Sequence, residues 1–156
     1  MKMPELLPAS QASTSNLAIA LLWLPRPRRT DAMLFYRFCR TIDDIADEPG
    51  RSVQEKQDRL AAWLETVESG LHPEIERLLA RYAIDRSLLA AIVCGCASDI
   101  LPQRFQTLAD LEKYCWRVAC AVGLASIKIF GCRDPLSESY AVHLGHALQL
   151  TNILRD

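Results

Sequence analysis

Signals that begin and end helices recur along this sequence, and they constrain its fold more than any other feature. Ser52 is followed three positions later by Glu55, a spacing typical of the capping box at a helix start. Asp85 and Thr107 stand at comparable positions ahead of apolar segments, and no segment shows the alternation of a half-buried strand. We therefore predict an all-α fold with helices from the N-cap Thr30 to Glu48, over 52–70, 73–83, 85–100 and 107–131, and from Asp134-Pro135 into the C-terminus.

Length and composition favour one helical domain over residues 1–156, because half of the residues are apolar and can bury a core. The net charge of −1 provides no basic face, so we expect no nucleic-acid partner. The longest apolar run, Leu17–Leu24, is too short to span a bilayer and lacks the flanks of a signal peptide. These features predict a cytoplasmic protein.

Two further groups of residues receive simple interpretations. The RPRR segment at 26–29 is interpreted as a solvated loop, with contact to anionic lipid, and a peripheral position on the inner membrane, as the weaker alternative. The six cysteines have no spacing typical of a zinc site, so we expect reduced thiols, mostly within helices.

The segment FYRFCRTIDDIADE, residues 35–48, carries a carboxylate cluster on an otherwise apolar helix. At about 100° per residue, Asp43 and Asp47 lie one turn apart beside the apolar stripe, with Tyr36 and Arg40 on the same face. One alternative is a solvated edge of an amphipathic helix. The other is a Mg²⁺ site that binds a diphosphate, because Mg²⁺ prefers carboxylate oxygens and substrate phosphates. Geometry alone leaves the two interpretations equally supported.

The last predicted helix favours the second alternative. Gln149, Asn152 and Asp156 place oxygen-bearing side chains one turn apart, and the small residues Ala141 and Gly145 precede them on the same face. This pattern predicts an apolar pocket with a polar mouth. In the preceding helix Tyr114, Val118, Ala121 and Ala125 share a face, which fits either a pocket wall or close helix packing. His143 and His146 lie on the side opposite Asn152, and we interpret them as surface or packing residues.

Three motifs together resemble the squalene and phytoene synthase family of head-to-head prenyl transferases. The resemblance runs from about Ser13 to Asp156. It implies an isoprenoid-synthase-type helical bundle, here truncated to its N-terminal helices. The motifs are YRFCRTIDDIADE at 36–48, YCWRVACAVGL at 114–124 with IFG at 129–131, and ALQLTNILRD at 147–156.

The resemblance implies a role for each motif. Asp43, Asp47, Asn152 and Asp156 would be the metal ligands, and Arg40 and Arg155 would bind diphosphate. Tyr36 and Tyr114 would lie beside the reacting carbons. The residues expected to line the isoprenoid site are Val118, Ala119, Val122, Gly123, Gly145, Leu148, Gln149 and Asn152.

Three departures from the family pattern stand out. The last helix has no stop signal before Asp156, so we expect an incomplete fragment whose missing C-terminal helices would be partners within its own fold. Cys120 and Ala121 replace the Gly-Thr pair of the central motif. Ser15-Asn16-Leu17 stands where the family carries an aromatic residue.

The implied reaction is a Mg²⁺-dependent condensation of two prenyl diphosphates. The wording of the first motif favours the bacterial squalene-type branch, with farnesyl diphosphate converted toward presqualene diphosphate or squalene. The alternative branch forms phytoene from geranylgeranyl diphosphate. Squalene formation would also require NADPH, although no Rossmann-type fingerprint is visible. Two other functions stay open: a non-catalytic helical module or truncated pseudoenzyme, and a terpene cyclase. We expect the 156-residue chain by itself to be inactive.

Overall fold

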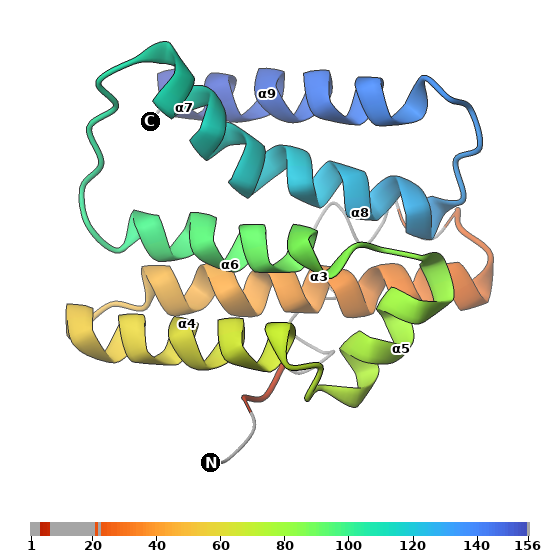
Figure 1. The fold of residues 1–156 in the computed structure, drawn as a ribbon, viewed down its shortest axis with the longest axis horizontal. Helices are drawn as coiled ribbons and strands as arrows, with labels where there is room; N and C mark the ends of the chain where they lie inside the picture. Colours follow the sequence, from red (N-terminus) through yellow and green to blue (C-terminus); the bar gives the residue numbers. More distant parts are fainter. Residues whose placement is uncertain (1–3, 7–20, 22, 156) are drawn as a thin grey trace.

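The computed structural model describes residues 4–6, 21 and 23–155, and the regular structure in these residues is entirely helical (Figure 1). This confirms the predicted all-α fold. The helices are α3 (Arg26–Asp47), α4 (Val53–Glu68), α5 (Pro73–Tyr82), α6 (Arg86–Asp99), α7 (Leu108–Cys115), the π-helical segment η1 (Trp116–Cys120), α8 (Ala121–Phe130) and α9 (Ser137–Arg155).

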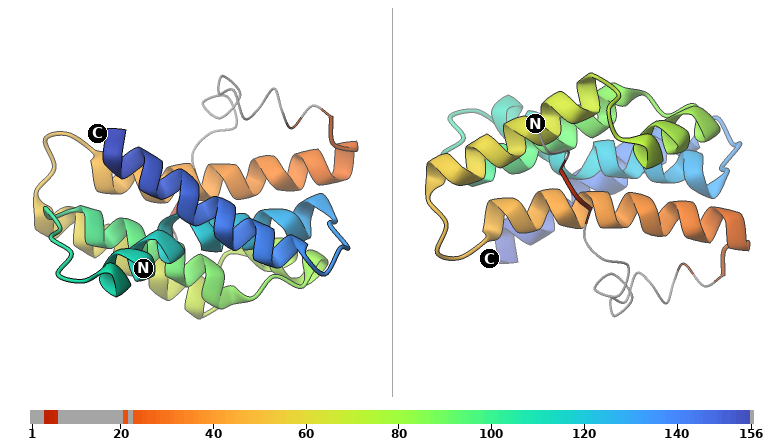
Figure 2. Two further views of the ribbon diagram at one scale, coloured as in Figure 1. Left: turned by 90° about the horizontal axis from the view of Figure 1, so that it is seen from above. Right: turned by 90° about the horizontal axis from the view of Figure 1, so that it is seen from below.

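The helices stack in layers around α3 and α6. These two central helices contact each other, with α4 on one side and the rod formed by α7, η1 and α8 on the other (Figure 1). The outermost helix, α9, lies across η1 and α8, and α5 contacts α3. Views from above and below show that α3 and α9 both finish at the same end of the molecule (Figure 2).

The apolar stripe of α3 forms much of the core. Phe38 and Ile42 are fully buried, and the ring of Phe38 meets Trp63 of α4 edge-on, with the ring centroids 5.8 Å apart. Leu89 of α6 is equally buried. The predicted apolar stripe is confirmed, and its buried residues include Phe35, Phe38, Ile42, Ile45 and Ala46.

Local capping explains where several helices begin. Ser52 and Glu55 form both hydrogen bonds of the predicted capping box at the start of α4. Thr107 and Asp110 form the same pair at the start of α7, and the side chain of Asp85 accepts a hydrogen bond from the Ser87 amide. These side chains satisfy amides that a helix start otherwise leaves without partners.

Two predicted helix starts were wrong. The helix α3 begins at Arg26, so Thr30 is not its N-cap, and the hydroxyl of Thr30 instead donates to the Arg26 carbonyl. Proline is tolerated in the first turn of a helix, because a backbone N–H at that position would have no acceptor within the helix. The RPRR segment is therefore helical and not the loop that we predicted. The helix α9 begins at Ser137, because Asp134 accepts a hydrogen bond from the Leu136 amide and organises a turn first.

The predicted long helix over 107–131 is one rod, but it is not regular. Residues Trp116–Cys120 form a π-helical segment between α7 and α8. A π turn holds more residues than an α turn, so side chains before and after it do not keep the 3.6-residue periodicity. Tyr114 therefore does not share one regular face with Ala121 and Ala125, both of which are fully buried in the core.

Small residues bring α9 close to the rod. A Cβ atom on Gly145 would lie 2.8 Å from the Cα atom of Cys120, and one on Gly123 would lie 3.2 Å from the Ala141 carbonyl oxygen. The prediction that Gly145 and Ala141 leave space for an apolar molecule was therefore wrong. Their missing side-chain volume is filled by the backbone and side chains of η1 and α8.

Among the helices of the described residues, none combines the length and the apolar character that a bilayer crossing requires.

The close approach at Gly145 generates a stability prediction. We expect Gly145→Ala to lower the free energy of unfolding by about 1–2 kcal/mol, because overpacking against the Cys120 backbone outweighs the gain in helix propensity. The matched control is Ala147→Leu, a larger change at an exposed position of α9, which should stay within about 0.5 kcal/mol of the wild type. Chemical denaturation measures both. A stabilised Gly145→Ala variant would contradict the packing of α9 on η1.

Candidate active site

Carboxylates gather at one end of the molecule because of where three helices end. The helix α3 ends just after the aspartate motif, at Asp47, and α6 ends at Asp99. The helix α9 also finishes at this end (Figures 1 and 2). We call this the carboxylate end, defined by Asp43, Asp44, Asp47 and Asp99.

Arg40 holds two of these carboxylates. Its guanidinium donates to Asp43 Oδ2 at 2.7 Å and to Asp44 Oδ1 at 2.5 Å. All three side chains are close to half exposed. Arg40 therefore already faces the aspartate motif and is positioned to reach an anion bound there. Asp47, one turn beyond Asp43, is exposed rather than flanking the core as predicted.

Asp99 joins the cluster from α6, and the sequence did not single it out. Its Oδ2 accepts a hydrogen bond from the Tyr114 hydroxyl at 3.1 Å. The Tyr114 ring also packs against Phe105, with 5.1 Å between ring centroids. One signal was available: an aspartate at the C-terminus of a helix opposes the helix dipole, so a residue of this kind invites another explanation.

The acidic groups affect one another's titration. Burial raises the pKa of Asp43, Arg40 lowers it, and the neighbouring Asp47 and Asp44 raise it further. Burial also raises the pKa of Asp99, the Tyr114 hydrogen bond lowers it, and the charges of Asp47 and Asp43 raise it. The carboxylates of α3 and α6 thus form one interacting group with incompletely compensated negative charge, and such a group favours a bound cation.

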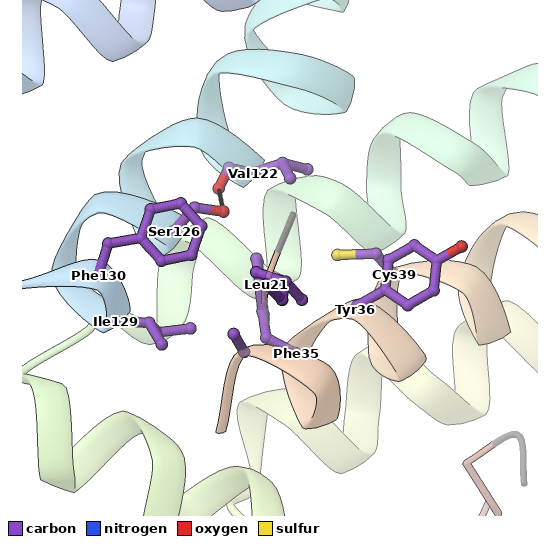
Figure 3. A pocket seen from close by; sticks show the side chains of 9 residues that line it. Leu21, Phe35, Tyr36, Cys39, Val122, Ser126, Ile129 and Phe130 are labelled. Atoms are coloured by element: carbon purple, nitrogen blue, oxygen red, sulfur yellow. Dashed lines mark hydrogen bonds between the residues drawn. The ribbon is translucent and has the colours of Figure 1, made fainter. Parts of the chain in front are cut away.

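A small apolar cavity of about 80 Å³ adjoins this cluster along α3. It lies between α3 and α8, with Tyr36 and Cys39 on one side and Val122 and Ser126 on the other (Figure 3). Tyr36 and Val122 are the two predicted site residues that line it. The other lining residues, to which the sequence assigned no role in the site, are Leu21, Ala32, Phe35, Cys39, Ser126, Ile129 and Phe130.

Other predicted site residues of the rod lie at helix contacts. Val118 packs against Gly95 of α6, where an added Cβ would approach Val118 Cγ1 to 2.6 Å. Gly123 faces α9, as described above, and Ala119 is partly buried within η1. The structure brings these residues to the interior of the bundle but not into the cavity beside Tyr36.

The predicted residues of α9 stand apart from the aspartate motif. The packing partners of α9 are η1, α8 and α7, and Leu148 and Asn152 are exposed. Gln149 is partly buried, and Arg155 is exposed at the end of the helix. Asp156 lies outside the described residues. His143 is exposed and contacts Ser139, as expected for a surface residue.

The donor groups at the end of α3 fit a metal ion only if a further ligand completes its coordination. Among the residues that the structure describes, no three histidine, cysteine, aspartate or glutamate side chains form a metal-binding group. Asp43 and Asp47 nevertheless provide two carboxylates one helical turn apart. Mg²⁺ is commonly bound by one or two carboxylates completed by substrate phosphates and water, so this pair fits it.

Comparisons with known proteins converge on one family. A family model described as "Squalene/phytoene synthase" matches residues 10–156. Among curated relatives, a presqualene diphosphate synthase from Zymomonas mobilis is 38% identical over 94% of this chain and 53% of its own length. A 15-cis-phytoene synthase from Synechococcus elongatus is 34% identical over 88% of this chain and 51% of its own.

Solved structures agree on the fold. A dehydrosqualene synthase aligns with a TM-score of 0.71 and 26% identity over 95% of this chain and 54% of that protein. A squalene synthase from Alicyclobacillus acidocaldarius aligns with a TM-score of 0.75 and 24% identity over 92% and 58%. The chain spans about half the length of the curated relatives described here.

The charge cluster generates a pH-dependent prediction for Asp99. Because its pKa is raised in the folded state, its ionised form destabilises the fold at neutral pH, and this cost disappears as the pH falls through that pKa. We expect Asp99→Asn, measured without divalent cations at pH 7, to raise the free energy of unfolding by about 0.5 kcal/mol. The difference should vanish below the ordinary aspartate pKa of about 3.9.

The control for this prediction is Asp58→Asn, which changes an exposed aspartate on α4. The change that this variant causes in the free energy of unfolding should not decrease in the same way as the pH falls. If Asp99→Asn were destabilising at neutral pH, the hydrogen bond from Tyr114 would outweigh the repulsion within the cluster, and our description of its charge balance would be wrong.

Proposed function

The chain belongs to the squalene/phytoene synthase family, and we propose that it forms the N-terminal, aspartate-bearing part of an enzyme that condenses two prenyl diphosphates head to head. The relatives named as presqualene diphosphate synthase and phytoene synthase support this class of reaction. Because the chain spans about half of their length, the activity is proposed for the longer protein and not for these 156 residues alone.

One observation supports the proposal best. A single face of α3 changes from apolar to anionic along its length, with Tyr36 and Cys39 at the cavity and Arg40 and Asp43 one turn further on. A prenyl diphosphate has the same two-part character. Its hydrocarbon would lie toward the cavity side of α3 and its diphosphate toward the carboxylate end.

Asp43 and Asp47 would hold Mg²⁺, with Asn152 and Asp156 as the ligands expected from the last motif. The bound ion would neutralise the diphosphate leaving group and polarise the bond to its carbon. Arg40 would exchange part of its contact with Asp43 and Asp44 for charge-assisted hydrogen bonds to diphosphate oxygens. Arg155 would add a second cationic contact from α9.

The chain's own residues would then protect the allylic cation that forms when diphosphate departs. The apolar walls of the cavity, including Val122, would exclude water, which would otherwise quench the cation. The aromatic faces of Tyr36 and Tyr114 would stabilise positive charge. The hydrogen bond to Asp99 and the contact with Phe105 would hold the Tyr114 ring in place. Capture of the cation by the double bond of the second substrate, followed by proton loss, gives a cyclopropane.

We favour farnesyl diphosphate as substrate and presqualene diphosphate as the first product. The YRFCRTIDDIADE motif and the relatives named as presqualene diphosphate synthases support this branch. Geranylgeranyl diphosphate and phytoene form the alternative branch, which relatives named as phytoene synthases support. NADPH would be required only for a later reductive step to squalene.

Two other functions make different predictions. A non-catalytic helical module or pseudoenzyme is favoured by the exposure of α9, where Leu148 is 57% and Leu154 is 88% exposed. It predicts no turnover even in the longer protein. A terpene cyclase would convert one prenyl diphosphate without joining two, and the QLTNILRD segment at 149–156 argues against it.

Turnover in the longer protein tests the proposed reaction. With radiolabelled farnesyl diphosphate and Mg²⁺, we expect a product that contains two prenyl chains, and removal of Mg²⁺ with a chelator should abolish its formation. Asp43→Ala should reduce turnover by roughly 100-fold or more, because stabilisation of the leaving group is lost. The 156-residue chain alone should give no measurable product.

Asp58→Ala is the matched control, since this exposed aspartate on α4 should be replaceable with little effect on turnover. Equal activity of the wild type and the Asp43→Ala variant would remove Asp43 from the mechanism. A product with a single prenyl chain would favour the cyclase, and a folded longer protein without turnover would favour the pseudoenzyme.

A further inference from the structure

The apolar cavity between α3 and α8 extends away from the carboxylate end. On α3 its lining runs backwards along the chain, from Cys39 to Ala32. On α8 it comprises Val122, Ser126, Ile129 and Phe130. Because Tyr114, at the other end of the rod, contacts Asp99, Phe130 is the lining residue of α8 that lies farthest from the carboxylate end. Figure 3 shows Phe130 and Cys39 on opposite sides of the cavity.

The length of this path matches the length of a particular prenyl chain. The axial rise of an α-helix places Ala32 about 16 Å from Asp43 along α3. With carbon–carbon bonds of about 1.5 Å, an extended farnesyl chain is about 15 Å long, and one further isoprene unit adds about 5 Å. A farnesyl chain with its diphosphate beside Asp43 would therefore reach the far end of the cavity. A geranylgeranyl chain would need space beyond that end.

One large side chain at the far end of the cavity is not part of the core. Phe130 is 38% exposed, so its ring stands between the cavity and the surroundings of the bundle. The neighbouring apolar lining residues are each at most 5% exposed, and they are Leu21, Ala32, Phe35 and Ile129. A phenyl ring and an isoprene unit have nearly the same number of carbon atoms. Removal of the Phe130 ring would therefore leave a space comparable to one isoprene unit.

The backbone that carries Phe130 is held in place on both sides. The helix α8 ends at Phe130, and Gly131 follows with a φ of 80°, in the left-handed region that favours glycine. The Gly131 amide donates to the Ile127 carbonyl oxygen at 3.0 Å. From α3, the Arg28 guanidinium donates to the Ile129 carbonyl oxygen at 2.5 Å. A wall anchored in this way does not move aside easily for a longer chain.

We propose that Phe130 determines the length of the prenyl chain, by closing the far end of the cavity to chains longer than farnesyl. This inference rests on the proposed function and deepens it, because it names the side chain that selects between the two candidate substrates. The Phe130 ring would contact the last isoprene unit of a farnesyl chain. It would overlap with the additional unit of a geranylgeranyl chain, and overlap with an anchored side chain is unfavourable.

Competition between the two diphosphates in the longer protein tests the proposal. The wild type should have a kcat/KM for farnesyl diphosphate at least about tenfold higher than for geranylgeranyl diphosphate. Phe130→Ala should raise the relative kcat/KM for geranylgeranyl diphosphate by about tenfold or more, and mass spectrometry of the products measures the change. Phe130→Trp adds volume at the same position, so it should lower the turnover of farnesyl diphosphate as well.

The matched control is Tyr140→Ala, which removes an aromatic ring that is 66% exposed and does not line the cavity. This variant should leave the ratio of the two kcat/KM values unchanged. Circular dichroism verifies that each variant is folded.

Binding of unreactive analogues separates this proposal from the proposed reaction. Thiolodiphosphates of the two prenyl groups keep the chain and the charge of the substrates but resist cleavage, and calorimetry measures their affinities. The wild type should bind the farnesyl analogue at least about tenfold more tightly, and Phe130→Ala should remove most of this difference.

Each outcome bears on the proposal. A wild-type preference for the geranylgeranyl analogue, or the same affinity ratio in the wild type and Phe130→Ala, would overturn the role of Phe130 and leave the proposed reaction intact. The expected change in affinity without any turnover would support the role of Phe130 and contradict the proposed reaction. A longer protein that binds neither analogue would overturn both.

Discussion

The burial of Phe38 and Ile42 fixes α3 in the bundle, and the carboxylate end depends on this contact. Both side chains are fully buried, and Phe38 meets the edge of Trp63. Side chains leave a helix in fixed directions, so anchoring one face determines where the next face points. Tyr36 and Asp43 therefore lie beside the core in a defined order. A helix held only by surface contacts could not keep these two groups aligned with α6 and α8.

Much of the fold was predictable because several helix boundaries are set by local chemistry. The side chains of Ser52, Asp85 and Thr107 make their capping hydrogen bonds within three residues, so the local sequence is enough to identify these helix starts. The start of α3 was missed because no side chain caps it and two prolines suggested a break. Arg28 then contacts Ile129 from a residue 101 positions away. Such a contact stabilises the first turn of α3 and leaves no trace in the local sequence.

The candidate site was predictable to the extent that it lies on one helix. The shared face of Tyr36, Arg40 and Asp43 follows from helical periodicity, and the structure places them in that order. Asp99 could not be assigned in this way, because its contact with Tyr114 depends on how α6 and α7 are arranged in space. The prediction for Gly145 was wrong for a related reason. A missing side chain can create a cavity or admit another helix, and only tertiary structure distinguishes the two.

The π-helical segment Trp116–Cys120 has a consequence for the evolution of this bundle. It absorbs one extra residue within a single rod, comparable to an insertion that both halves tolerate. Deleting one residue within it would restore an uninterrupted α-helix without turning the residues beyond it, because the π turn takes up its additional residue locally. Val122 would then stay in the wall that faces α3 while Tyr114 stayed beside Asp99. The same deletion in a regular α-helical part of the rod would instead turn everything beyond it by about 100°.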